Sequence, residues 1–299
     1  MTNVRRVFVW ALLVSCAGCG DDGTSGASAG SPDTSSGAAA GSGGSSSSSS
    51  SSGGGAMGAS GAEPASGASN GFSWAFAAAA VGFDCNESSA ALLAKKVTHV
   101  TVGGSTVFVG MQQISANDQD PVVARFDPSG AKVFCEHSKK GGGIDGRAYG
   151  VTWDGKDSLY VVYTIVGGGT LFDAAAKGGW LSSYGDGGGS SKVTVVGALD
   201  AATGVVKRAT FVPSRLVKNG QTKTNTLTPA DAVHVLADGS LELLGNAAYC
   251  TLNPDRSSMC DPAKSDDYPK AYRARFTADL STMTCASATG VSVVKQPCP

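Results

Sequence analysis

Charged and aromatic side chains are both scarce in this sequence, and their scarcity narrows what the protein can do. Charged residues make up 16% of the 299 positions and aromatic residues 7%, and 23 basic residues against 24 acidic ones leave a formal net charge of −1. A protein that holds nucleic acid through its charge needs a basic surface, and this composition predicts none. We therefore expect no nucleic-acid partner.

Two common ligand-binding patterns are also missing. Residues 72–299 contain no pair of cysteines at the C-x-x-C spacing of zinc sites. The glycine clusters at 141–146, 165–170 and 185–190 lack the G-x-x-x-x-G-K-[ST] pattern of phosphate-binding loops. No local motif joins a histidine to a nucleophile. The sequence therefore predicts no metal and no cofactor, and it gives no positive sign of an enzyme.

The N-terminal segment has the features of an export signal. Arg5 and Arg6 precede an apolar run of eight residues, Val7 to Val14. This run is too short to span a bilayer as a helix, which takes about 20 apolar residues. It leads into the tetrapeptide LVSC, which places Leu13 three positions before Cys16.

This tetrapeptide resembles the lipobox of bacterial lipoproteins, in which the signal is cut before a cysteine that becomes triacylated. The resemblance implies a signal peptide at 1–15 and a lipid on Cys16, with Cys19 as the competing acceptor because small Gly18 precedes it. Three acyl chains exceed the two membrane signals that stable anchoring takes. We therefore expect membrane attachment in the bacterial cell envelope, at the outer membrane or cell surface. The alternative is ordinary signal cleavage, which would release a soluble secreted protein.

Residues 16–71 are predicted to be a linker. Between Gly20 and Gly71 the chain has 17 Ser, 15 Gly and 10 Ala, including an unbroken run from Ser45 to Ser52. Such a segment has no apolar periodicity with which to offset the entropy of ordering its backbone. We expect it to be disordered, and we expect one folded domain at 72–299.

Three segments of this domain align with one another, at 97–135, 148–209 and 231–285. Each reads as strand, tight turn, strand, variable loop, strand, tight turn and strand. The first tight turns are Gly103-Gly104, Asp154-Gly155 and Asp238-Gly239. Glycine-containing turns of this kind between β-branched runs are typical of hairpins. Each segment is therefore predicted to be a four-stranded antiparallel meander.

Repeated meanders are the units of β-propellers, and this chain resembles the blades of bacterial surface-protein and quinoprotein-like propellers. Ala198, Asp200, Thr203 and Gly204 match the A-x-D-x-x-T-G core of the quinoprotein type, although Arg208 stands where a Trp is expected. The resemblance implies an all-β fold, namely a small β-propeller of about three to four four-stranded antiparallel blades. An open stack of three sheets and a dimer that shares a ring are the alternatives.

The remaining parts of the domain suggest how such a ring would close. Residues 72–82 and 288–296 are both strand-like, and we expect them to pair as a partial fourth blade that joins the two ends. Residues 87–96 are predicted to form a short helix capped by Ser88 or Ser89.

Six cysteines fall in the domain, and outside the inner membrane an even number predicts disulfides. Cys250 and Cys260 lie in one loop, and Cys135 and Cys285 end corresponding repeats. On this basis the expected pairs are Cys85–Cys135, Cys250–Cys260 and Cys285–Cys298.

Two kinds of candidate site follow from the repeats. His99 and His234 occupy the same repeat position, so both would approach the axis of a propeller. The longer connections all leave one edge of the blades, where binding residues tend to gather on rigid scaffolds. The binding candidates in these connections are Trp180, Tyr184, Tyr249, Tyr268, Asp266 and Asp267.

The sequence therefore predicts an envelope protein that binds a protein or glycan through its long-loop face. Two other functions stay open. One is a hydrolase or other enzyme with a site at the propeller axis, and the other is a structural surface spacer.

The lipid assignment predicts the outcome of metabolic labelling with a palmitate analogue. The wild-type chain should take up the label, and Cys16→Ala should lose it, because the acylated thiol is gone. Cys19→Ala is the matched control and should keep the label. A label retained by Cys16→Ala and lost from Cys19→Ala would move the acceptor to Cys19.

Overall fold

Antiparallel strands supply nearly all the regular structure of the chain. The computed structural model describes residues 64–137, 145–166, 172–184, 191–218, 221–260 and 270–299. The lipidation candidates Cys16 and Cys19 lie outside these ranges. In the described part of the chain, neither helix is long and apolar enough to cross a membrane.

The first repeat forms a four-stranded sheet in the order β3-β4-β5-β6. Its strands are β3 (Thr98–Val102), β4 (Ser105–Gln113), β5 (Gln119–Phe126) and β6 (Lys132–His137). Gly103 and Gly104 both have positive φ angles, 58° and 82°. Two successive positive φ angles give a turn whose twist matches that of the flanking strands, so these glycines set the β3–β4 hairpin as predicted.

The second repeat supplies the middle of a six-stranded sheet in the order β1-β2-β7-β8-β9-β10. Its strands are β1 (Ala65–Ser69), β2 (Phe72–Phe76), β7 (Asp145–Trp153), β8 (Ser158–Val166), β9 (Lys192–Asp200) and β10 (Val206–Val212). Strand β8 is a run of apolar and aromatic residues buried on both faces.

The third repeat forms a sheet in the order β13-β15-β16-β17, with β14 also paired to β15. Its strands are β13 (Leu227–Pro229), β14 (His234–Val235), β15 (Leu241–Ala247), β16 (Lys270–Phe276) and β17 (Met283–Ala288). A separate two-stranded sheet joins β11 (Ser214–Lys218) to β12 (Gln221–Asn225).

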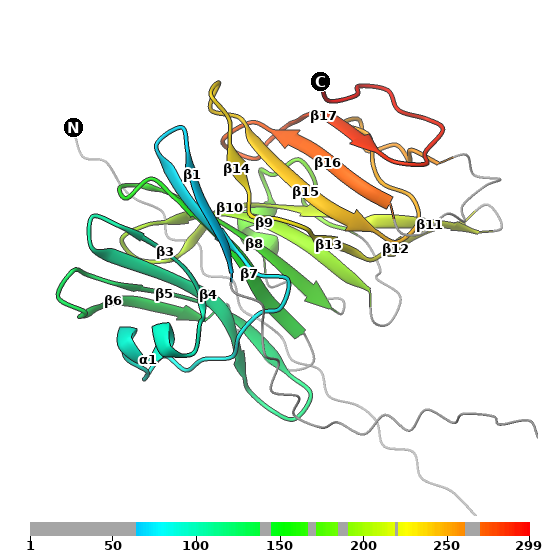
Figure 1. The fold of residues 1–299 in the computed structure, drawn as a ribbon. Coiled ribbons are helices and arrows are strands. Elements are labelled where there is room, and N and C mark those ends of the chain that lie inside the picture. The colour runs from blue at the N-terminus through cyan, green and yellow to red at the C-terminus, as the bar shows by residue number, and fades with distance from the viewer. Residues whose placement is uncertain (1–63, 138–144, 167–171, 185–190, 219–220, 261–269) are drawn as a thin grey trace, which may run out of the picture. The chain divides into compact units, whose positions relative to one another are not determined.

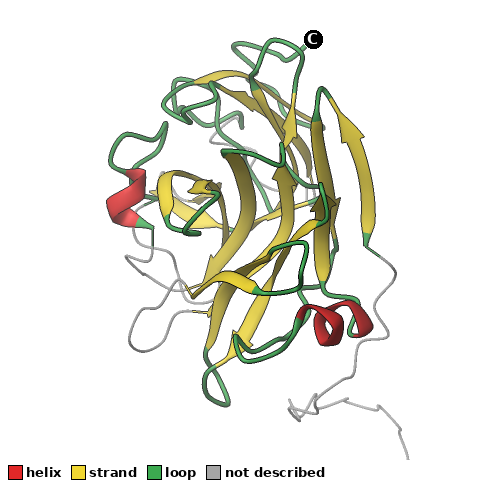
Figure 2. Ribbon diagram, turned by 90° about the vertical axis from the view of Figure 1, so that its left-hand side faces the viewer, coloured by secondary structure: helices red, strands yellow, loops and turns green. Residues whose placement is uncertain are grey.

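Two short helices lie at the edges of this strand assembly (Figure 2). They are α1 (Ser89–Ala94) and α2 (Asp173–Ala176). The Ser88 side chain accepts a hydrogen bond from the Ala91 backbone at the start of α1, which confirms the predicted cap.

The predicted all-β class is correct, but the predicted β-propeller is wrong. The three meanders form open antiparallel sheets rather than the blades of a closed ring (Figure 1). The expected fourth blade is also missing from the described residues. Strand β2 pairs with β7, so it extends the second meander. Residues 289–296 form no strand, and their Gln296 carbonyl accepts a hydrogen bond from Ala286 of β17.

The folded domain begins earlier in the sequence than predicted. Ala65–Ser69, expected to be disordered, forms β1 and pairs along its whole length with β2. The indole of Trp74 lies over Gly67, where an added Cβ would meet the ring at 2.8 Å. A composition of Ala, Ser and Gly conceals this strand because small residues are the ones that fit under the indole.

The six-stranded sheet makes specific contacts with the other two repeats. On one side, Arg125 of β5 lies 4.9 Å from the Trp153 ring centroid and donates a 2.6 Å hydrogen bond to the Ala201 carbonyl. On the other side, Thr194 of β9 donates to the Leu227 carbonyl at 2.7 Å. Buried residues of all three repeats belong to one continuous apolar core.

Seven aspartates share one role at the turns of the fold. Each carboxylate accepts a hydrogen bond from the backbone N–H two residues later, which closes the turn locally. The seven are Asp84, Asp127, Asp154, Asp200, Asp238, Asp255 and Asp279.

Three of these turn carboxylates are the most acidic. Hydrogen bonds to the charged form lower the pKa to about 2 for Asp200, mainly through Lys207, and to about 2 for Asp255, mainly through Lys295. For Asp279 the main donor is the Thr277 hydroxyl, and the pKa is again about 2. In the unfolded chain an aspartate titrates near pKa 3.9.

These values predict acid sensitivity with a defined sign. A carboxylate with a depressed folded-state pKa contributes stability above the unfolded pKa and loses it as the pH falls through the folded one. Denaturant unfolding should therefore show a free energy of unfolding that decreases from about pH 4 to about pH 2. Asp279→Asn should make this decrease shallower, whereas Asp157→Asn, at an exposed position that is not one of these turn carboxylates, should not. An equal slope in all three chains would contradict the assignment.

Candidate functional site

Two of the long-loop candidates are buried in the structure. Trp180 and Tyr184 are only 2% and 5% exposed, so their side chains lie in the core rather than on an exposed loop face. Tyr268, Asp266 and Asp267 lie outside the described residues.

Trp180 instead links the segment after α2 to the third sheet. Its indole N–H donates to the Pro254 carbonyl at 2.7 Å, and its ring meets Phe276 edge-on at 6.0 Å between centroids. Its backbone N–H donates to the Leu280 carbonyl at 2.7 Å. This long connection therefore packs in the core. Burial of the large indole of Trp180 stabilises the fold more than exposure would.

Tyr184 and Tyr249 are also structural. The Tyr184 ring packs against Phe211 at 4.9 Å, and its carbonyl accepts a 2.8 Å hydrogen bond from Arg215. Tyr249 is half-buried and has a positive φ of 69°, next to disulfide-bonded Cys250.

The two histidines occupy separate environments rather than one axis. His99 Nδ1 lies 2.8 Å from the Val97 carbonyl, and the ring packs on Phe108. His234 Nε2 lies 3.0 Å from a carboxylate oxygen of Asp231, and its ring meets Trp74 edge-on at 4.9 Å. The predicted convergence has no propeller axis on which to occur.

The outward face of the third sheet gathers the polar side chains that sequence reasoning missed. In β15 the residues Leu241 and Leu243 point into the core and are fully buried, so Glu242 and Leu244 face outward. The strand register places His234, Glu242, Arg275 and Cys285 in one row across four strands.

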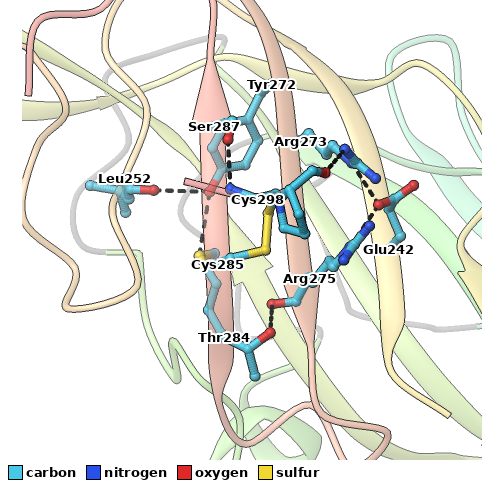
Figure 3. Close-up of a disulfide and its surroundings, with 11 residues drawn as sticks. Glu242, Leu252, Tyr272, Arg273, Arg275, Thr284, Cys285, Ser287 and Cys298 are labelled. Atoms are coloured by element: carbon cyan, nitrogen blue, oxygen red, sulfur yellow. Dashed lines mark hydrogen bonds and ion pairs between the residues drawn. A yellow bond between two sulfur atoms is a disulfide. The ribbon is translucent and has the colours of Figure 1, made fainter. Parts of the chain in front are cut away.

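Glu242 is the centre of an ion-pair cluster on this face (Figure 3). Its carboxylate accepts from Arg273 Nε at 2.6 Å and from Arg275 Nε at 2.9 Å, and its side chain is only 12% exposed. Burial pushes the pKa of Glu242 upward, but the hydrogen bonds from Arg275 and Arg273 outweigh it and hold the pKa below its usual value. The carboxylate therefore stays charged and holds both guanidinium groups in place.

The C-terminal residues are held beside this cluster. Cys298 is bonded to Cys285 of β17, and its backbone N–H donates to the Ser287 hydroxyl at 2.8 Å (Figure 3). The Pro299 carbonyl accepts a 2.7 Å hydrogen bond from Arg273. The six domain cysteines are joined in the three pairs expected from the sequence, with S–S distances of 2.00 to 2.10 Å.

A shallow cavity of about 420 Å³ opens next to Arg273 on the same face. Small and aliphatic residues from β15, β16 and β17 make up most of its wall. The lining residues are Ala230, Leu244, Gly245, Asn246, Ala271, Tyr272, Arg273, Ser287, Ala288 and Thr289. A concave, mainly apolar surface with one charged group at its edge is the usual form of a binding site.

Potential metal ligands converge at one place among the described residues, away from this cavity. Cys85, Cys135 and His137 have ligand atoms within 4.8 Å of one another. Both sulfur atoms are already joined in a disulfide.

Comparison with protein-family models, curated proteins and solved structures found no match to this chain.

The burial of Trp180 predicts a stability effect where the sequence suggested a binding effect. Trp180→Ala should lower the free energy of unfolding by about 3–5 kcal/mol, the usual cost of removing a buried indole. Ser182→Ala, at an exposed position two residues later, is the control and should change it by less than about 0.5 kcal/mol. Denaturant unfolding measures both values, and a Trp180→Ala chain as stable as the control would contradict the packing role.

Proposed function

We propose that the protein is a lipid-anchored bacterial cell-envelope protein whose disulfide-braced all-β domain binds a partner protein. The observation that carries the proposal is the cavity on the outward face of β15–β17, together with the Arg273 guanidinium at its edge. The lipobox-like LVSC sequence supports attachment at Cys16.

The lining of the cavity favours a protein segment over a glycan. Carbohydrate sites commonly present an exposed aromatic ring on which a sugar packs. Tyr272 is the aromatic residue of this lining, and it is 2% exposed with its hydroxyl donating to the Leu252 carbonyl at 2.9 Å. The outward residues are instead short or aliphatic, such as Ala271 and Leu244, and they suit an apolar side chain of a partner.

Arg273 would add direction to such an interaction. Its Nε and Nη1 groups donate to Glu242 and Pro299, and a guanidinium carries five N–H donors in a fixed plane. The remaining donors suit a carbonyl or carboxylate of the partner. Because Glu242 already fixes the guanidinium, binding costs little side-chain entropy at this position.

The test is photo-crosslinking of the full-length chain in its native envelope. A photoreactive residue at Ala271, which is exposed on the cavity wall, should crosslink to one partner protein. Asn246→Trp should abolish this crosslink, because the indole fills the cavity from its exposed edge. Val133→Trp, an equal change on exposed β6, is the control and should leave the crosslink intact.

The other outcomes would each overturn part of the proposal. A crosslink to a glycan would reject the protein partner. Equal crosslinks from Ala271 and from the exposed turn residue Ala202 would show no specific site and favour a structural spacer. A crosslink that survives Asn246→Trp would move the binding surface away from the cavity.

A further inference from the structure

The Cys85–Cys135 disulfide has a polar environment that sets it apart from the other two. His137 Nε2 lies 2.7 Å from Cys85 Sγ, within reach of an N–H···S hydrogen bond. The Lys132 ammonium group donates to the Cys85 carbonyl. One sulfur of this bond is therefore next to an imidazole and close to a cation.

The other two disulfides provide internal comparisons. Cys250 is fully buried and Cys260 is 5% exposed, so a reagent in solvent has little access to that bond. Cys285 and Cys298 are half-buried, as Cys85 and Cys135 are. Access alone therefore does not separate Cys85–Cys135 from Cys285–Cys298. Cys285 lies opposite Arg275, whose guanidinium is paired with Glu242, whereas Cys85 has an imidazole nitrogen 2.7 Å from its sulfur. What distinguishes the two bonds is this titratable imidazole beside a sulfur atom.

We propose that Cys85–Cys135 is a thiol–disulfide exchange site that reacts with a low-molecular-weight thiol. The thiolate of that compound attacks Cys135 Sγ and forms a mixed disulfide, and the bonding pair of the broken S–S bond leaves with Cys85 Sγ. The attacking thiol has already lost its proton to solvent, and His137 is an imidazolium that faces the departing Cys85 thiolate. A leaving thiolate stabilised in this way departs faster.

A second equivalent of the same thiol completes the reaction. Its thiolate attacks the external sulfur of the mixed disulfide, releases the oxidised dimer of the small thiol, and leaves Cys135 as a thiol. Two electrons thus pass from two external thiols to the Cys85–Cys135 pair. The half-buried sulfurs pack against an apolar cluster that includes Phe83 and Phe126, so a small thiol fits better than a cysteine of a folded protein.

The surrounding structure holds the segment of Cys85 when the bond opens. Phe83 donates its backbone N–H to the Met111 carbonyl at 2.9 Å, and Met111 donates back to the Val81 carbonyl at 3.2 Å. The Gln112 amide donates to the Asp84 carboxylate at 2.7 Å. Because these bonds do not involve the disulfide, the site can open and close without unfolding.

Several charged groups surround His137 and bear on its protonation. Of the acidic residues on the neighbouring segments, Asp84 and Glu87 are close in sequence to Cys85, and Asp120 lies on β5, which pairs with β6. Glu136 precedes His137 on β6, so its side chain points to the opposite face of the sheet. Glu87 is paired with Lys95 at 2.5 Å, and Asp84 accepts hydrogen bonds from Gln112 and Asn86. Lys132 opposes the imidazolium.

The experiment follows the three disulfides in one molecule. The oxidised full-length chain is incubated with glutathione, trapped with an alkylating reagent, and mapped by mass spectrometry. Glutathione should appear on Cys135 and the alkyl group on Cys85. This bond should open roughly tenfold faster than Cys285–Cys298, as expected for a leaving thiol activated by an adjacent imidazolium. A folded protein dithiol used in place of glutathione should react more slowly at this bond, and a faster reaction would reject the small-thiol substrate.

Two further measurements separate the imidazole from simple access. The rate advantage over Cys285–Cys298 should decrease as the pH rises through the ordinary imidazole range near 6.5, because the ratio cancels the ionisation of glutathione. His137→Asn should reduce the advantage to about one, with an unchanged near-ultraviolet circular dichroism spectrum to show that the sheet is intact.

A pH-independent ratio would reject the proposal even if the variant failed to fold. So would equal opening of the two half-buried bonds in the wild-type chain, or glutathione on Cys85 rather than Cys135.

Discussion

The antiparallel pairing of β2 with β7 determines how the rest of the domain is assembled. Four residue pairs, from Ser73 opposite Trp153 to Phe76 opposite Gly150, close the edge of the second meander that a ring would leave free. The same strand brings Trp74 against His234, and Asn70 beside it donates a 2.8 Å hydrogen bond to the Val235 carbonyl. Because β2 occupies this edge of β7, no other strand can pair there. The contacts of Trp74 and Asn70 hold the third repeat against the β2–β7 pair, and the sheets stay open. The outward face of β15–β17 is accessible as a consequence.

The disulfides act on segments that strand pairing holds weakly. Cys85 lies in an irregular stretch between β2 and α1, and Cys298 lies in the C-terminal residues beyond β17. Each of these cysteines is bonded to a strand residue, Cys135 of β6 or Cys285 of β17. Cross-links of this kind stabilise mainly by limiting the unfolded chain. The Arg273 and Glu242 pair depends on the same arrangement, because Arg273 also holds the Pro299 carbonyl.

Much of the local structure could be predicted from the sequence because its causes are local. Gly103 and Gly104 set one hairpin through their backbone freedom, and Ser88 caps α1 through its hydroxyl. The meanders follow from the period of their apolar residues. The cysteine pairs follow from neighbouring positions in the repeats.

The features that could not be predicted depend on contacts between distant segments. The paired residues of β2 and β7 are more than 70 positions apart in the sequence. The hydrophobic pattern does not show whether β2 pairs with β7 or with the C-terminal segment. Trp180 lies in a long connection, and only the fold shows that its ring packs against Phe276 and that its indole N–H donates to the Pro254 carbonyl. The cluster on the outward face was visible only as Arg273 and Arg275 alternating with buried residues, a pattern that also describes an ordinary solvated strand.

If Cys16 carries the proposed lipid, the position of β1 has a mechanical consequence for the domain. Ala65, the first residue of β1, lies opposite Phe76, so the chain enters at the open end of the hairpin rather than at its turn. A pull on the preceding residues therefore breaks the hydrogen bonds between β1 and β2 one after another. Such peeling takes little force at each step, and it separates β1 before any load reaches β2 and the rest of the six-stranded sheet. In a chain anchored as proposed, β1 would therefore separate before the rest of the sheet.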